Sequence, residues 1–158
     1  MKIAIHGDMK SKKDLVKDVA LRLGYKKAPD FMKTSLKERG GGAKMLSAIK
    51  DIDVRYYCMV DVIGRMQSYD MATFDFVTGL TYTDVVDEFE TLHPEHPLLG
   101  ELKLLAVTSL SYFDIVFIVP GAKLDIPPEV EGKIKVIPLR GDSISKLTDE
   151  IVRQVVDL

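Results

Sequence analysis

The sequence predicts an α/β protein, a three-layer α/β/α architecture with a mostly parallel sheet. Two observations support this class. Four short apolar runs rich in β-branched residues lie far apart along the chain, and segments with helical spacing of apolar residues separate them. The predicted strands are residues 2–6, 73–78, 114–120 and 133–139. Strands and helices that alternate in this way are typical of a parallel sheet covered by helices on both faces.

The first and last helices are the most clearly defined. The first begins near Asp14, and Gly24 stands where a helix C-cap is expected. The last begins after Asp142 or Ser143 as N-cap and carries one apolar face to the end of the chain. Further helices are predicted at residues 31–39, 44–49, 55–67 and 98–109, and one more after Thr83 as its cap.

Length and composition exclude several classes of protein. The 158 residues contain no linker or repeat, so we expect a single domain over residues 1–158. A net charge of -2 gives no reason to expect duplex nucleic acid as a partner. No apolar run reaches the roughly 20 residues that cross a bilayer, and the start has no signal-peptide pattern. We therefore expect a cytoplasmic protein, or one in a host cytoplasm if it is viral. Its oligomeric state is open, with a homodimer as one option.

The stretch GDMKSKKD, residues 7–14, is the strongest functional signal. A phosphate-binding loop reads G-x-x-x-x-G-K-[ST]. Gly7 and Lys13 match this pattern, whereas Lys12 replaces the second glycine and Asp14 replaces the hydroxyl. The loop follows a predicted strand and leads into a helix N-terminus, where anions are attracted. The predicted phosphate-binding residues are Gly7, Asp8, Met9, Lys10, Ser11, Lys12, Lys13 and Asp14. The alternative is an ordinary helix start with solvated lysines.

The opening resembles phage-type deoxynucleoside monophosphate kinases, a divergent branch of the P-loop kinases whose loop often reads GKD. On that comparison Asp14 agrees with the family and only Lys12 departs from it. Three further segments are similar to segments of that family: APDFMKTSLKE at 28–38, VRYYCMVDVIGRMQ at 54–67 and IPLRGDSISKLTDEIVRQVV at 137–156. The resemblance implies a P-loop kinase-like fold. It also implies ATP and Mg²⁺ as cofactors, with phosphoryl transfer to a deoxynucleoside monophosphate or a related small substrate.

The resemblance also implies roles for single residues. Lys13 would neutralise charge on the transferred phosphoryl group, and Asp14 would help to hold Mg²⁺. The remaining candidates are the substrate-binding residues Arg39, Arg55 and Arg65, with Arg55 also acting in catalysis, together with Asp84 as an acid near the metal and Arg140 near the base of the nucleotide. Each of these arginines has a solvated surface position as its alternative.

One departure from the family pattern bears on whether the protein is an active kinase or an inactive relative. After the third strand the family usually has an Asp-x-Arg cluster, but this chain reads VTGLTYTD, with Gly79 and Thr81 at those positions. Because phosphoryl transfer depends on positioning and charge, the loss of two charged groups favours a second hypothesis. In that hypothesis the protein is a catalytically inactive pseudo-kinase that serves as a binding or assembly module. A third hypothesis is another α/β enzyme, such as a nucleotide hydrolase or a deoxyribosyl transferase.

Overall fold

The computed structural model describes residues 1–27, 75–79 and 81–157 except for 127 and 129, together with Asp61 and Arg65. The chain forms two compact units. One comprises Met1–Ala28 and Thr73–Leu158, and the other comprises Pro29–Ala72. The predicted helices at 31–39, 44–49 and 55–67 lie outside the described residues, apart from two helical residues of the last one, Asp61 and Arg65.

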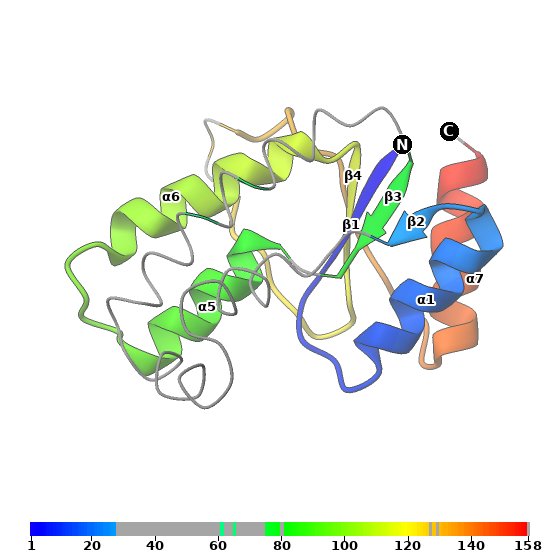
Figure 1. The fold of residues 1–158 in the computed structure, drawn as a ribbon, viewed down its shortest axis with the longest axis horizontal. Coiled ribbons are helices and arrows are strands. Elements are labelled where there is room, and N and C mark those ends of the chain that lie inside the picture. Colours follow the sequence, from blue (N-terminus) through cyan, green and yellow to red (C-terminus); the bar gives the residue numbers. More distant parts are fainter. Residues whose placement is uncertain are drawn as a thin grey trace. The chain divides into compact units, whose positions relative to one another are not determined.

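The larger unit is built on a five-stranded sheet (Figure 1). Its strands are β1 (Lys2–His6), β2 (Lys26–Lys27), β3 (Phe76–Thr78), β4 (Ile115–Ile118) and β5 (Val136–Pro138). They lie in the order β2-β3-β1-β4-β5, and every neighbouring pair is parallel. The first strand therefore occupies the centre of the sheet. There Ile3 stands opposite Val77 on one side and Ile115 on the other.

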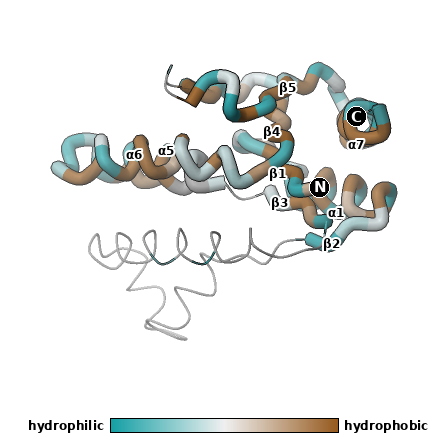
Figure 2. Tube along the Cα trace, turned by 90° about the horizontal axis from the view of Figure 1, so that it is seen from above, coloured by the Kyte–Doolittle hydropathy of each residue, from teal (hydrophilic) through white to brown (hydrophobic). Residues whose placement is uncertain are grey.

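Helices cover both faces of this sheet. They are α1 (Lys12–Leu23), α5 (Tyr82–Leu92), α6 (Leu99–Ser109) and α7 (Ile144–Val156). Figure 2 shows α1 and α7 on one side of the strands and α5 and α6 on the other. The predicted α/β class with a parallel sheet is thus confirmed. No helix within the described part of the chain is long and apolar enough to cross a membrane.

The core follows from the alternation of side chains along β1. Ile3 and Ile5 are fully buried and belong to one apolar cluster with residues of α1 and α7, such as Val19 and Ile151. Ala4 and His6 alternate with them, so they face α5 and α6. Full burial of an aliphatic side chain contributes about 1.5–3 kcal/mol, so this double-sided strand anchors the unit. The loop that follows β1 therefore leaves from a rigid position.

Local sequence signals explain the ends of the helices. Gly24 takes the left-handed conformation at the C-cap of α1, with φ of 71°, as expected. The Ser143 hydroxyl accepts a hydrogen bond from the Lys146 N–H at 3.2 Å and caps α7. The prediction of Thr83 as a helix cap is wrong, because α5 already begins at Tyr82. The Thr83 hydroxyl has another partner, which belongs to the candidate site.

Candidate functional site

The candidate site lies at the carboxyl ends of β1, β3 and β4. The chain leaves β1 toward α1 on one face of the sheet, and it leaves the neighbouring β3 toward α5 on the other face (Figures 1 and 2). When adjacent parallel strands lead to opposite faces, their loops diverge and open a crevice, which is where ligands of open α/β sheets bind. The predicted loop at residues 7–14 lies at this crevice.

A pocket of about 660 Å³ occupies this position. Its lining combines two lysines and two aspartates with glycines at the ends of two strands. The lining residues are His6, Gly7, Asp8, Lys12, Gly79, Asp87, Thr91, Leu92, Ala122 and Lys123. Four of them, His6, Gly7, Asp8 and Lys12, come from the end of β1, the loop that follows it and the start of α1. Asp87 and Lys123 were not among the residues predicted from the sequence. Asp87 follows the predicted Asp84 by three residues in α5, and this helical spacing is the signal that could have identified it.

Gly7 gives the loop its shape. It is buried and has φ of 110°, a backbone conformation that side chains with a Cβ rarely adopt. A Cβ at this position would lie 2.5 Å from both the Ala122 Cβ and a Val119 methyl group. Glycine is therefore required here twice, for its backbone angle and for the close approach of the loop after β4. The pattern-based choice of Gly7 as a key loop residue has this physical basis.

A buried hydrogen-bond network lies under the pocket. The His6 Nδ1 is 2.9 Å from the Thr83 Oγ and 3.2 Å from the Thr81 Oγ, and these two hydroxyls are 2.8 Å apart. On the other side of the ring, Nε2 donates to the Lys123 carbonyl oxygen at 3.0 Å. The network thus ties together the end of β1, the start of α5 and the loop after β4. The end of β1, α5 and the loop after β4 each contribute residues to the lining of the pocket.

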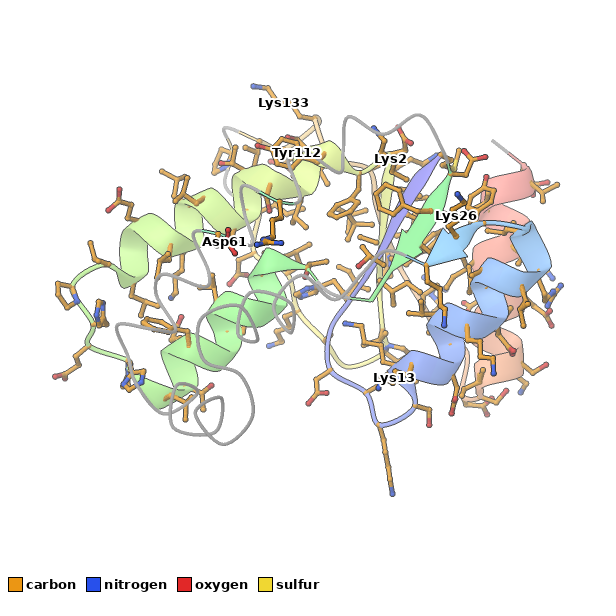
Figure 3. All side chains as sticks on the ribbon, viewed as in Figure 1. Lys2, Lys13, Lys26, Asp61, Tyr112 and Lys133 are labelled. Atoms are coloured by element: carbon orange, nitrogen blue, oxygen red, sulfur yellow. The ribbon has the colours of Figure 1, made fainter. Side chains whose placement is uncertain are left out.

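The N-terminus of α1 faces the same edge. The first α-helical hydrogen bond of α1 runs from the Leu15 N–H to the Ser11 carbonyl at 3.1 Å, so the amides of Lys13 and Asp14 precede the helical ladder. The Ser11 side chain makes no capping hydrogen bond. Amides at this end of a helix carry partial positive charge and suit an anion. Lys13 and Asp14 are themselves exposed, and Figure 3 shows Lys13 at the first turn of α1.

Lys12 and Lys13 have different surroundings. Lys12 is partly buried and lines the pocket, whereas Lys13 is exposed and is not among the lining residues. The Lys12 stem runs past Gly79 at the end of β3. A Cβ at Gly79 would lie 3.4 Å from the Lys12 Cε and 2.8 Å from a Val16 methyl group. Two of the three positions that depart from the pattern of the resembled kinases, 12 and 79, are therefore neighbours in space.

The other predicted site residues are not gathered at the pocket in the described part of the chain. Arg140 is exposed after β5, and its N–H donates to the Glu150 Oε1 at 3.0 Å. Arg65 forms an ion pair with Asp61 at 2.9 Å in the smaller unit. Arg39 and Arg55 lie outside the described residues. Asp84 belongs to α5, and its side chain is likewise outside the description.

A second pocket of about 430 Å³ adjoins the first through shared lining residues. Asp87 and Lys123 line both of them. The rest of the second pocket is formed by α5, α6 and the loop after β4, with an ion pair between Glu90 and Lys103 at 2.5 Å. Its remaining lining residues are Thr83, Val86, Leu104, Ala106, Val107, Leu124 and Asp125. A carboxylate that lines both pockets can act on a group bound in either of them.

Three aspartates near the pocket fit the Mg²⁺ that would accompany a bound nucleotide. No group of three or more His, Cys, Asp or Glu side chains could hold a metal ion among the described residues. Mg²⁺ usually keeps several waters and takes one or two carboxylates together with substrate phosphates. Asp8 and Asp87 at the pocket, and Asp14 in the first turn of α1, can supply that number.

No protein-family description matches this chain, and no curated protein or solved structure matches it significantly.

Proposed function

We propose that this protein binds a nucleoside triphosphate at the loop of residues 7–14 and transfers its terminal phosphoryl group to a small acceptor. The observation that supports this most is the pocket at the crevice of the sheet, lined by Gly7, Lys12 and Lys123 beside the N-terminus of α1. Lysine side chains and helix N-terminal amides bind phosphate oxygens. The resemblance of the sequence to phage-type deoxynucleoside monophosphate kinases implies ATP as the donor and a deoxynucleoside monophosphate or a related small substrate as the acceptor.

The residues have distinct tasks in this proposal. Amides of Lys13 and Asp14 bind and orient the phosphates, and the lysines offset the negative charge that spreads over the phosphoryl oxygens in the transition state. Mg²⁺, when it is bound with the nucleotide, supplies further charge neutralisation, with Asp14 or an aspartate of the pocket as its protein ligand. Asp87 lines both pockets, so it is placed to orient an acceptor in the second pocket.

A second candidate function is nucleotide binding without chemistry. Thr81 stands where the related kinases have a charged residue, and it is fully buried with its hydroxyl 2.8 Å from that of Thr83. Position 79 is a glycine, and the room left by its missing side chain lies next to the Lys12 side chain. Neither residue can supply charge to a transferred phosphoryl group. A pseudo-kinase that uses bound nucleotide for assembly is consistent with both.

Calorimetry with ATP, with and without Mg²⁺, tests the proposal. The wild-type protein should bind ATP, and the double variant Lys12→Met/Lys13→Met should bind it at least about tenfold more weakly. Lys17→Met is the matched control, because Lys17 is an exposed lysine of the same helix outside the pocket. An equal loss in all variants, or no binding by the wild type, contradicts the proposal.

An assay of ADP release across the deoxynucleoside monophosphates then separates the two functions. Turnover that requires an acceptor supports the kinase. ATP binding without turnover for any acceptor supports the pseudo-kinase.

A further inference from the structure

We infer that Lys12, rather than the motif lysine Lys13, is the side chain that contacts the bound phosphates, and that Gly79 is the residue that makes room for it. This inference rests on the proposed function. It identifies which of the two adjacent lysines of the loop places its positive charge at the phosphates. The sequence pattern points to the opposite assignment, since the phosphate-loop motif places its lysine at position 13 and a glycine at position 12.

Position in the helix distinguishes the two lysines. Lys12 is the first residue of α1, and its N–H donates to the Met9 carbonyl at 3.2 Å. Successive residues of a helix point about 100° apart, so Lys12 and Lys13 leave α1 in different directions. Lys12 is partly buried and lines the pocket with Gly7 and His6, while Lys13 is exposed away from the lining.

Lys12 does not need the backbone freedom of the glycine that it replaces. No residue other than glycine has a positive φ in the described part of the chain, and Lys12 is helical. Its Cβ is therefore tolerated at this position. What the substitution requires is space for a long side chain, and this space lies over the end of β3.

Gly79 provides that space. The Cβ of any other residue at position 79 would lie 3.4 Å from the Lys12 Cε and 3.7 Å from its Cγ, and 2.8 Å from a Val16 methyl group. The two contacts with Lys12 fall in the range of ordinary van der Waals packing, and the contact with Val16 requires something to shift. A side chain at position 79 would therefore occupy the space beside the Lys12 stem and restrict its path to the pocket. The motif glycine is replaced by Lys12 in the loop, and the glycine at position 79 provides the room that the Lys12 side chain needs.

The test compares Lys12→Met with Lys13→Met, because methionine keeps an unbranched apolar stem and removes the charge. The probes are sodium tripolyphosphate and ATP, titrated calorimetrically at low salt without added Mg²⁺. We expect Lys12→Met to weaken both ligands by about tenfold or more, as for the loss of a charged hydrogen bond, and Lys13→Met to weaken them by less than about threefold. Circular dichroism during heating verifies that each variant is folded.

A double-mutant cycle tests the pairing with Gly79. Gly79→Ala should weaken tripolyphosphate binding several-fold in the wild-type background and leave it unchanged in the Lys12→Met background. An equal effect in both backgrounds overturns the role of Gly79. If Gly79→Ala does not fold, the comparison of the two lysine variants still decides the assignment of the charge.

The outcomes separate this inference from the proposed function. If Lys13→Met loses affinity and Lys12→Met does not, the inference is wrong and the nucleotide site stands. If the wild-type protein binds neither tripolyphosphate nor ATP, both are wrong. A loss confined to Lys12→Met supports both.

Discussion

His6 at the end of β1 and Thr83 in the first turn of α5 meet in a buried hydrogen bond of 2.9 Å. The Lys123 carbonyl oxygen can only accept, so the His6 Nε2 carries a hydrogen. In the neutral ring, Nδ1 is then the acceptor and the Thr83 hydroxyl is the donor. The almost fully buried imidazole thereby fixes the first turn of α5 and the loop after β4 to the central strand.

Thr83→Val should therefore lower the free energy of unfolding by about 1 kcal/mol, since it removes a buried hydrogen bond while the Thr81 hydroxyl, 3.2 Å from Nδ1, can still donate to the ring. Urea denaturation measures this. Thr108→Val is the matched control, because Thr108 is exposed and its hydroxyl donates to the Leu104 carbonyl of its own helix. Its change should stay below about 0.5 kcal/mol. Equal losses in both variants would show that the buried network does not stabilise the fold.

Gly7→Ala should destabilise the protein by at least about 2 kcal/mol, through a strained backbone and a clash with the loop after β4. Gly100→Ala is the contrast. Nothing lies within 4 Å of a Cβ at Gly100 in α6, so alanine should leave stability unchanged or raise it by up to about 1 kcal/mol. Thermal unfolding of the two variants compares them directly, and a similar melting temperature for both would contradict the role given to Gly7.

Stability should fall as the pH rises above about 10, in part because of Tyr25. Burial, and then the negative charges of Asp75 and Asp114, raise the pKa of Tyr25 above its ordinary value. The folded state thus retains the tyrosine proton at a pH where the unfolded chain has lost it, so this stabilisation is lost as the pH passes the folded pKa. Denaturation midpoints at rising pH should decline less steeply for Tyr25→Phe. Parallel declines for the variant and the wild type would exclude this contribution.

Asp87→Asn should lower the rate of phosphoryl transfer by up to about 10² if the carboxylate orients the acceptor, with the affinity for ATP changed by less than about threefold. Asp18→Asn is the control, because Asp18 is exposed on α1 and lines neither pocket. Steady-state assays and calorimetry measure the two quantities separately. A fall in ATP affinity without a fall in turnover would assign Asp87 to nucleotide binding.

Much of the fold was predictable because its signals are local. Strand 2–6, the glycine C-cap of α1 and the serine N-cap of α7 depend on residues close in sequence, and the structure confirms all three. The strand β2 was missed since it consists of Lys26 and Lys27, both exposed, and carries no apolar pattern. Its place in the sheet is fixed by pairing with Phe76 and Val77, far along the chain.

The candidate site was predictable only in outline. The loop could be located from a strand that ends at a glycine before a helix. Which lysine faces the pocket depends on the rotation of α1 and on Gly79, a residue far away in sequence. Thr81 illustrates the same limit. In the sequence, Thr81 is notable because it stands where the resembled kinases have a charged residue. In the structure, its buried hydroxyl lies within hydrogen-bonding distance of the His6 ring.

The two edges of the described sheet bear on how copies of this protein can meet. One edge is β2, only two residues long and formed by exposed lysines. On the other edge the Leu139 N–H donates inward to the Ile118 carbonyl at 2.8 Å, so the preceding residue, Pro138, faces outward without an N–H. Short charged strands and outward prolines prevent edge-to-edge growth of sheets. The strand edges of the larger unit thus disfavour edge-to-edge pairing between copies of the protein.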